Sequence, residues 1–90
     1  MINAGNLVIS IAGRDKGRYF LVMKIDEKYV YLCDGKKRKI DKIKKKKIKH
    51  VQKTNYFSKE LSEKINNNYE ITNKQIRDFI KEIIVSKEVK

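Results

Sequence analysis

Hydrophobic residues in the first half of the chain follow the short pattern of β-strands. Residues 7–11 are rich in β-branched side chains, and residues 18–25 are nearly continuous in apolar residues, so we expect both faces of this second strand to be partly covered. Residues 29–33 alternate between two faces, and residues 46–51 can form a fourth strand. Short strands at this spacing, separated by turn signals, predict a small barrel or sandwich.

Glycines mark the turns between these strands. Gly13 and Gly17 bracket the turn after the first strand, and Gly35 follows Asp34 after the third. Glycine adopts positive φ at little cost, so all three are predicted to form turns. Asp15, between the first two glycines, is expected to accept hydrogen bonds from nearby backbone N–H groups.

The hydrophobic period changes to that of helices in the last third of the chain. Ser58 can cap a short helix that the asparagines at 66–68 then interrupt. Thr72 and Gln75 match a capping box, and a longer helix is predicted over residues 73–86. Its apolar face consists of Ile76, Phe79, Ile80, Ile83 and Ile84. This face has to be buried, either on the chain's own barrel or on a protein partner.

The distribution of charge changes this picture most. The 90 residues suffice for one domain, and 23 Lys and Arg against 11 Asp and Glu give a formal net charge of +12. Residues 36–50 alone hold ten basic residues and one acid, Asp41, a net +9. Such an excess attracts polyanions: nucleic acid, an anionic membrane or an acidic protein. A membrane is the least favoured of the three, because the basic segment is not an amphipathic helix with large apolar anchors.

Several segments resemble a known motif: residues 8–10, then 13–18 with Gly17 closing the turn, then 20–22. Together they are similar to the KOW motif. Residues 22–26 and 30–35 resemble the KOW proteins of the large-subunit ribosomal type called fourteen-e and their small bacterial relatives. The resemblance covers about residues 5–52 and implies a small SH3-like barrel that binds RNA, with a role on or near the ribosome in translation.

The fold class expected from these features is mostly β with C-terminal α. An SH3-like barrel of the KOW type would span residues 1–53 and carry the lysine-rich segment 36–50. A helical extension over residues 54–90, one short and one longer helix, would pack on the barrel or on a partner. The lysine-rich segment is denser in lysine than the KOW pattern requires.

Phosphate groups of RNA, in particular ribosomal RNA, are the expected ligands of the basic residues. Lysine is a point charge that positions a nucleic acid more than it specifies a sequence. Tyr29 and Tyr31 can stack on unpaired bases, although core packing is the commoner role of such residues. A solvated charged loop is the alternative interpretation of these basic residues. The residues predicted to bind RNA are Arg14, Lys16, Arg18, Lys36, Lys37, Arg38, Lys39, Lys42, Lys44, Lys45, Lys46, Lys47, Lys49 and His50.

Catalytic and metal chemistry is not indicated. Cys33 is the only cysteine and His50 the only histidine, too few for a metal site or a nucleophile with its base and orienting group. We therefore expect no enzyme and no cofactor, and a reducing, cytoplasmic environment. Two further functions stay open: a protein-interaction adaptor, and a transcription-associated KOW protein that binds DNA.

Overall fold

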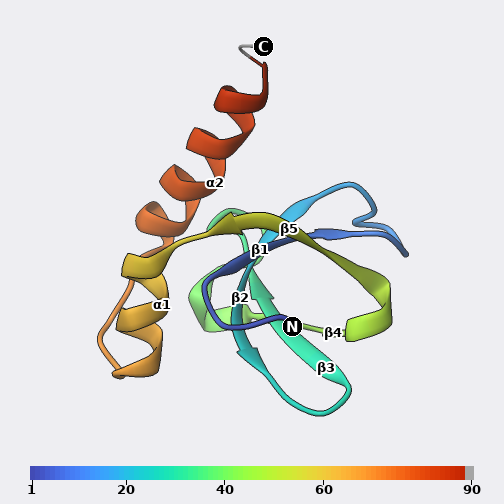
Figure 1. Cartoon of the computed structure of the whole chain (residues 1–90), viewed down its shortest axis with the longest axis horizontal. Coiled ribbons are helices and arrows are strands. Elements are labelled where there is room, and N and C mark those ends of the chain that lie inside the picture. Colours follow the sequence, from blue (N-terminus) through green and yellow to red (C-terminus); the bar gives the residue numbers. More distant parts are fainter. Residues whose placement is uncertain (89–90) are drawn as a thin grey trace.

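Five antiparallel strands form one sheet, and two helices follow it in the chain (Figure 1). The computed structural model describes residues 1–88. The strands lie in the order β4-β3-β2-β1-β5. Among the described residues no backbone pairing joins the edge strands β4 and β5, so the sheet is not closed. The strands are β1 (Asn6–Ser10), β2 (Tyr19–Ile25), β3 (Tyr29–Cys33), β4 (Lys44–Lys47) and β5 (Val51–Phe57).

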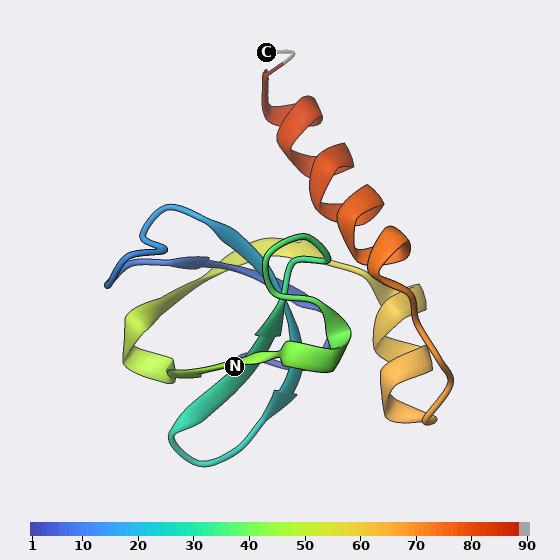
Figure 2. The same ribbon diagram turned by 180° about the vertical axis from the view of Figure 1, so that it is seen from behind.

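The predicted fourth strand over residues 46–51 was wrong in its extent. One turn of 3-10 helix, η2 (Ile48–His50), divides it and carries the chain from one edge of the sheet to the other (Figure 2). The break is necessary because β4 pairs with β3, whereas β5 pairs with β1. The fifth strand was not predicted, because its exposed Gln52, Lys53 and Asn55 give it little apolar character. It continues to Phe57, beyond residue 53.

The central strands β1, β2 and β3 are largely buried on both faces. Phe20, Val22, Val30 and Leu32 belong to one cluster on the concave, inner side. Leu21 and its partners across the strands belong to a second cluster on the outer side, which the helices cover. Since successive residues of a strand point to opposite faces, a strand between two cores reads as continuously apolar. The prediction that both faces of the second strand are covered is confirmed.

Both helices begin at the caps that the sequence indicates. The Ser58 side chain accepts a hydrogen bond of 3.1 Å from the Leu61 N–H at the start of α1 (Lys59–Asn66). Before α2 (Asn73–Glu88), the Gln75 N–H donates to Thr72 Oγ1 and the Thr72 N–H donates to Gln75 Oε1, at 3.1 and 2.9 Å. This reciprocal pair is the predicted capping box, and the predicted long helix is confirmed.

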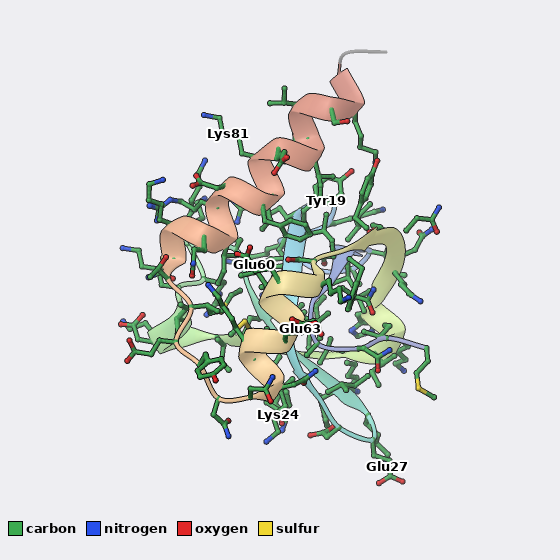
Figure 3. The ribbon with its side chains drawn as sticks, turned by 60° about the vertical axis from the view of Figure 1, so that its left-hand side comes forward. Tyr19, Lys24, Glu27, Glu60, Glu63 and Lys81 are labelled. Atoms are coloured by element: carbon green, nitrogen blue, oxygen red, sulfur yellow. The ribbon has the colours of Figure 1, made fainter. Side chains whose placement is uncertain are left out.

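The apolar face of α2 is covered by the protein itself. Ile76 is fully buried, and Ile80 and Ile83 are less than a tenth exposed, within the outer cluster. Phe79 and Ile84 pack against the same cluster and are partly buried. Figure 3 shows both helices on this one face of the sheet. The face therefore completes the core, and the alternative that it docks on a protein partner is not supported.

Candidate nucleic-acid interface

The four consecutive lysines of β4 point alternately to the two sides of the sheet. Lys44 and Lys46 are partly buried and lie opposite Leu32 and Val30 of the inner core. Lys45 and Lys47 are exposed on the outer side. Side-chain direction in a strand has a period of two, so a run of identical residues is divided into two sets with different environments. The four lysines therefore have two roles.

The inward lysines meet a buried carboxylate. Lys46 Nζ lies 2.9 Å from Asp15 Oδ1, and Lys44 Nζ lies 2.8 Å from Asp15 Oδ2. The Ser10 hydroxyl donates to Asp15 Oδ1 at 2.6 Å. The side chains of Asp15 and Lys46 are only 7% and 9% exposed. We refer to Ser10, Asp15, Lys44 and Lys46 as the Asp15 cluster.

The electrostatics of the Asp15 cluster favour the charged carboxylate. Burial alone would raise the pKa of Asp15, but its contacts with Lys44, Ser10 and Lys46 outweigh burial and hold the pKa well below its usual range. Lys46 also donates to the Ala12 carbonyl at 2.8 Å. The cluster thus fastens the turn between β1 and β2 to the edge strand β4. The partners of the Asp15 carboxylate are the side chains of Ser10, Lys44 and Lys46. The backbone N–H groups that the sequence suggested as donors are not among its partners in the described chain.

The outward lysines lie beside tyrosines of β3. Lys45 Nζ is 4.2 Å from the centre of the Tyr29 ring, and Lys47 is the direct cross-strand partner of Tyr29. Lys24 Nζ of β2 is 5.6 Å from the centre of the Tyr31 ring. These distances are within the range of cation–π attraction. Both tyrosines are partly exposed. We call these five residues the tyrosine–lysine surface.

Tyr31 is also held by a carboxylate. Its hydroxyl donates to Asp26 Oδ2 at 2.9 Å, in the turn between β2 and β3. This bond lowers the pKa of Asp26 and raises the pKa of the Tyr31 phenol. Asp26 Oδ1 further accepts the N–H groups of Lys28 and Tyr29. Asp26 therefore holds the Tyr31 ring through its hydroxyl and the start of β3 through its backbone, while both rings stay partly open to solvent.

The basic loop, residues 36–39, is held by both its ends. The Asp34 side chain accepts the N–H groups of Lys36 and Arg38 at 2.8 and 2.9 Å. Arg77 of α2 donates to the Gly35 carbonyl at 2.8 Å. The loop is thereby clamped to the helix while its four side chains remain exposed. The sequence reveals the charge of this loop but not its anchor.

A second contact with α2 holds the chain just after the basic loop. The Ile40 N–H donates to Asn73 Oδ1 at 2.9 Å, where the one-turn helix η1 (Ile40–Lys42) begins. Gly35 has a φ of +76°, and its backbone lies directly against α2. Gly13 and Gly17 also have positive φ, so the three glycines predicted to form turns do so.

The remaining basic candidates are dispersed over the surface. Arg14, Lys16 and Arg18 are exposed on the turn after β1, which the Asp15 cluster fastens to β4. His50 is partly buried in η2. Lys42 and Lys49 are exposed at either side of β4. The structure thus gathers the tyrosines with the outward lysines and separates Lys44 and Lys46 from them.

Cys33 is a core residue. Burial raises the pKa of its thiol to about 12, so the nucleophilic thiolate is disfavoured. Within residues 1–88, no group of three or more His, Cys, Asp and Glu side chains has the geometry to hold a metal ion. Neither helix in this part of the chain is long and apolar enough to cross a membrane.

Comparisons with known proteins give no family assignment. No protein-family model matches the chain, and no curated protein matches it significantly in sequence.

Proposed function

We propose that this protein binds RNA through the tyrosine–lysine surface and the basic loop. The observation that carries the proposal is the position of Lys45, whose ammonium group lies 4.2 Å from the centre of the partly exposed Tyr29 ring. A cation for the phosphate and an aromatic ring for the base are in contact on neighbouring strands. Proteins that bind single-stranded nucleic acid combine positive charge with aromatic platforms in this way.

The exposed basic residues should strengthen the binding of RNA to this surface. Eight of the ten basic residues of segment 36–50 are exposed, and the other two, the inward lysines, are paired with Asp15. Each phosphate contact releases condensed counterions and strengthens binding at low salt. Because the exposed cations are mostly lysines, the expected binding has weak sequence preference.

We further propose that the protein is a KOW-type module with an SH3-like fold. Two features support this: the strand order β4-β3-β2-β1-β5, and the single 3-10 turn that joins the edge strands. A place on or near the ribosome and a role in translation follow from the resemblance of residues 5–52 to the fourteen-e type of KOW protein. Ribosomal RNA is accordingly the proposed ligand.

Fluorescence anisotropy with three labelled probes tests RNA binding. The probes are an RNA with a hairpin and unpaired loop, a DNA duplex of equal charge, and a poly-glutamate peptide, each titrated at several salt concentrations. We expect the RNA to bind most tightly, with log affinity falling against log salt by a slope of about −3 if about four phosphates are engaged. Tighter binding of the duplex would favour a DNA-binding role, and tighter binding of the peptide would favour an adaptor.

Sedimentation tests the ribosomal part of the proposal separately. The protein should co-sediment with ribosomal particles at low salt and be released by high salt or by RNase. Retention on a partner after RNase treatment would contradict RNA as the ligand. Binding to purified RNA without co-sedimentation would leave the RNA proposal standing and overturn the ribosomal one.

A further inference from the structure

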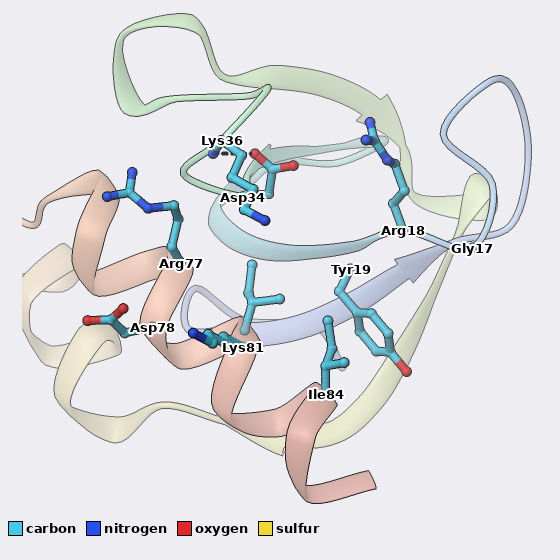
Figure 4. A pocket seen from close by; sticks show the side chains of 10 residues that line it. Gly17, Arg18, Tyr19, Asp34, Lys36, Arg77, Asp78, Lys81 and Ile84 are labelled. Carbon is cyan, nitrogen blue, oxygen red and sulfur yellow. Dashed lines mark hydrogen bonds between the residues drawn. The ribbon is translucent and has the colours of Figure 1, made fainter. Parts of the chain in front are cut away.

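A second surface combines positive charge with an aromatic ring. A groove of about 710 Å³ lies between α2 and the sheet, where β2 begins and β3 ends (Figure 4). Tyr19 and Ile84 contribute apolar surface to its lining. Four cations from three separate parts of the chain also line it: Arg18, Lys36, Arg77 and Lys81. None of the four forms an ion pair with any residue of the described chain.

The two acids in the groove have other partners. Asp34 accepts two backbone N–H groups of the basic loop. Asp78 forms an ion pair of 2.8 Å with Lys74, one turn earlier on α2. Since Lys74 offsets the charge of Asp78, the groove keeps an excess of positive charge. That excess is complementary to an anion.

Two groups of the groove are fixed before any ligand arrives. Arg77 Nη1 donates to the Gly35 carbonyl, which holds the guanidinium beside the basic loop. The Tyr19 hydroxyl accepts a hydrogen bond of 2.7 Å from Lys87 Nζ, which holds the ring against α2. A site whose groups are already in position loses less conformational entropy on binding.

We propose that this groove binds an unpaired, single-stranded segment of RNA. The four cations contact its phosphates, and the Tyr19 ring contacts a base. This inference rests on the proposed function and extends it, because it assigns the strand's path beyond the tyrosine–lysine surface. Lys36 belongs to both the basic loop and the groove, so a strand bound in the groove also meets the basic loop.

Single-stranded RNA fits this lining better than a duplex or an acidic peptide. The bases of a duplex are stacked within the helix, where the partly buried Tyr19 ring cannot reach their faces. An acidic peptide would satisfy the cations but would offer the open part of the Tyr19 ring no base to stack on. A positive groove with an aromatic side chain is the arrangement that single-strand-binding proteins use.

Two RNA probes test the inference: a blunt-ended hairpin, and the same hairpin with an unpaired 3′ extension of about six nucleotides, within the usual site sizes. We expect the extended hairpin to bind about tenfold more tightly, the gain expected from stacking one base. The double variant Arg18→Glu, Lys81→Glu should abolish this preference and leave binding of the blunt hairpin weakened only by its change of net charge.

Two control variants separate local effects from charge. Lys59→Glu and Lys53→Glu together make the same change of net charge outside the groove, on α1 and β5. This pair should preserve the tenfold preference. Circular dichroism of all variants verifies that they are folded. As a direct readout, 4-thiouridine in the extension should crosslink to peptides that contain Tyr19 or α2.

The outcomes separate the two proposals. If neither hairpin binds, the proposed RNA function fails, and the groove inference fails with it. If both hairpins bind equally, or if the crosslinks map only to β3 and β4, the groove inference is overturned while RNA binding stands. Displacement of the extended hairpin by poly-glutamate at equal charge concentration would also overturn it, because the groove would then recognise charge alone.

Discussion

The ammonium group of Lys46 lies 2.9 Å from the carboxylate of Asp15, although the two residues are 31 positions apart in the chain. This contact spans the inner side of the sheet and joins the turn after β1 to the edge strand β4. The lysine-rich segment looks in sequence like a continuous binding site for polyanions. One of its lysines, Lys46, is instead part of the folded core. The other inward lysine, Lys44, forms an ion pair of 2.8 Å with the second carboxylate oxygen of Asp15.

Replacement of Asp15 by asparagine is the first test of this cluster. The substitution leaves two lysines near the core without their partner, and we expect a loss of about 3 kcal/mol in the free energy of unfolding. For a domain of this size that corresponds to a fall in Tm of more than about 10 °C. Thermal denaturation at neutral pH measures it. Asp41→Asn is the matched control, because Asp41 is an exposed carboxylate without a side-chain hydrogen bond or ion pair to any described residue, and the Tm of this variant should change little.

The pH dependence of stability provides a second measurement on the same cluster. The pKa of Asp15 is lower in the folded than in the unfolded state, so its ionised carboxylate stabilises the fold. This stabilisation is fully present above the unfolded-state pKa of about 4 and is lost as the pH falls further. Urea denaturation between about pH 6 and pH 2.5 should show the wild-type protein losing stability more steeply than Asp15→Asn. Parallel curves for the two proteins would contradict the ionised, paired state of Asp15.

Matched lysine pairs of β4 should separate binding from folding. Lys45→Gln with Lys47→Gln removes two outward charges and should weaken RNA binding about tenfold, with Tm nearly unchanged. Lys44→Gln with Lys46→Gln removes the same net charge and strands the Asp15 carboxylate, so it should lower Tm strongly. Anisotropy and thermal denaturation of both pairs check this. Equal effects of the two pairs on Tm would show that the inward and outward lysines are equivalent.

Local features of the sequence were sufficient to predict the helices. The Thr72–Gln75 capping box and the i, i+3, i+4 spacing from Ile76 are short-range signals, and they place the start of α2 correctly. The second strand was likewise identifiable, since only burial on both faces explains so continuous an apolar run. β5 was missed because an edge strand with polar side chains lacks such a signal.

Long-range contacts account for what the sequence did not reveal. Nothing near Asp15 in the chain indicates that it pairs with lysines of β4, because the pairing depends on how the sheet curves. The groove depends in the same way on where α2 crosses the sheet, which brings Arg18 and Lys81 to one surface. Periodicity predicts which face of an element is buried, but not which elements meet.

Ile76 tests whether α2 is an integral part of the domain. It is fully buried between the helix and the outer face of the sheet. Ile76→Ala should cost about 3 kcal/mol, because it leaves a cavity in the outer core. Val85→Ala, at a position of α2 that is 47% exposed, should cost less than about 0.5 kcal/mol. Hydrogen exchange of β2 amides should accelerate only in the Ile76 variant; unchanged exchange would mean that the sheet is stable without the helix.

Gly35 and Gly17 form a matched pair for testing the clamp between the basic loop and α2. Both have positive φ, +76° and +88°, so alanine at either position is strained by its backbone conformation, at a cost of about 1–2 kcal/mol. A Cβ at Gly17 meets no atom within 4 Å, whereas one at Gly35 would collide with the Asn73 carbonyl oxygen and with Arg77.

Gly35→Ala should therefore be destabilising by at least 1 kcal/mol more than Gly17→Ala, roughly the cost of overpacking. Because the clash lies between loop and helix, it should also disturb the Arg77 hydrogen bond to Gly35 and raise hydrogen exchange in residues 35–40. Urea denaturation and exchange rates of both variants measure the difference. Equal loss of stability in the two variants would mean that the loop and the helix are not in contact at Gly35.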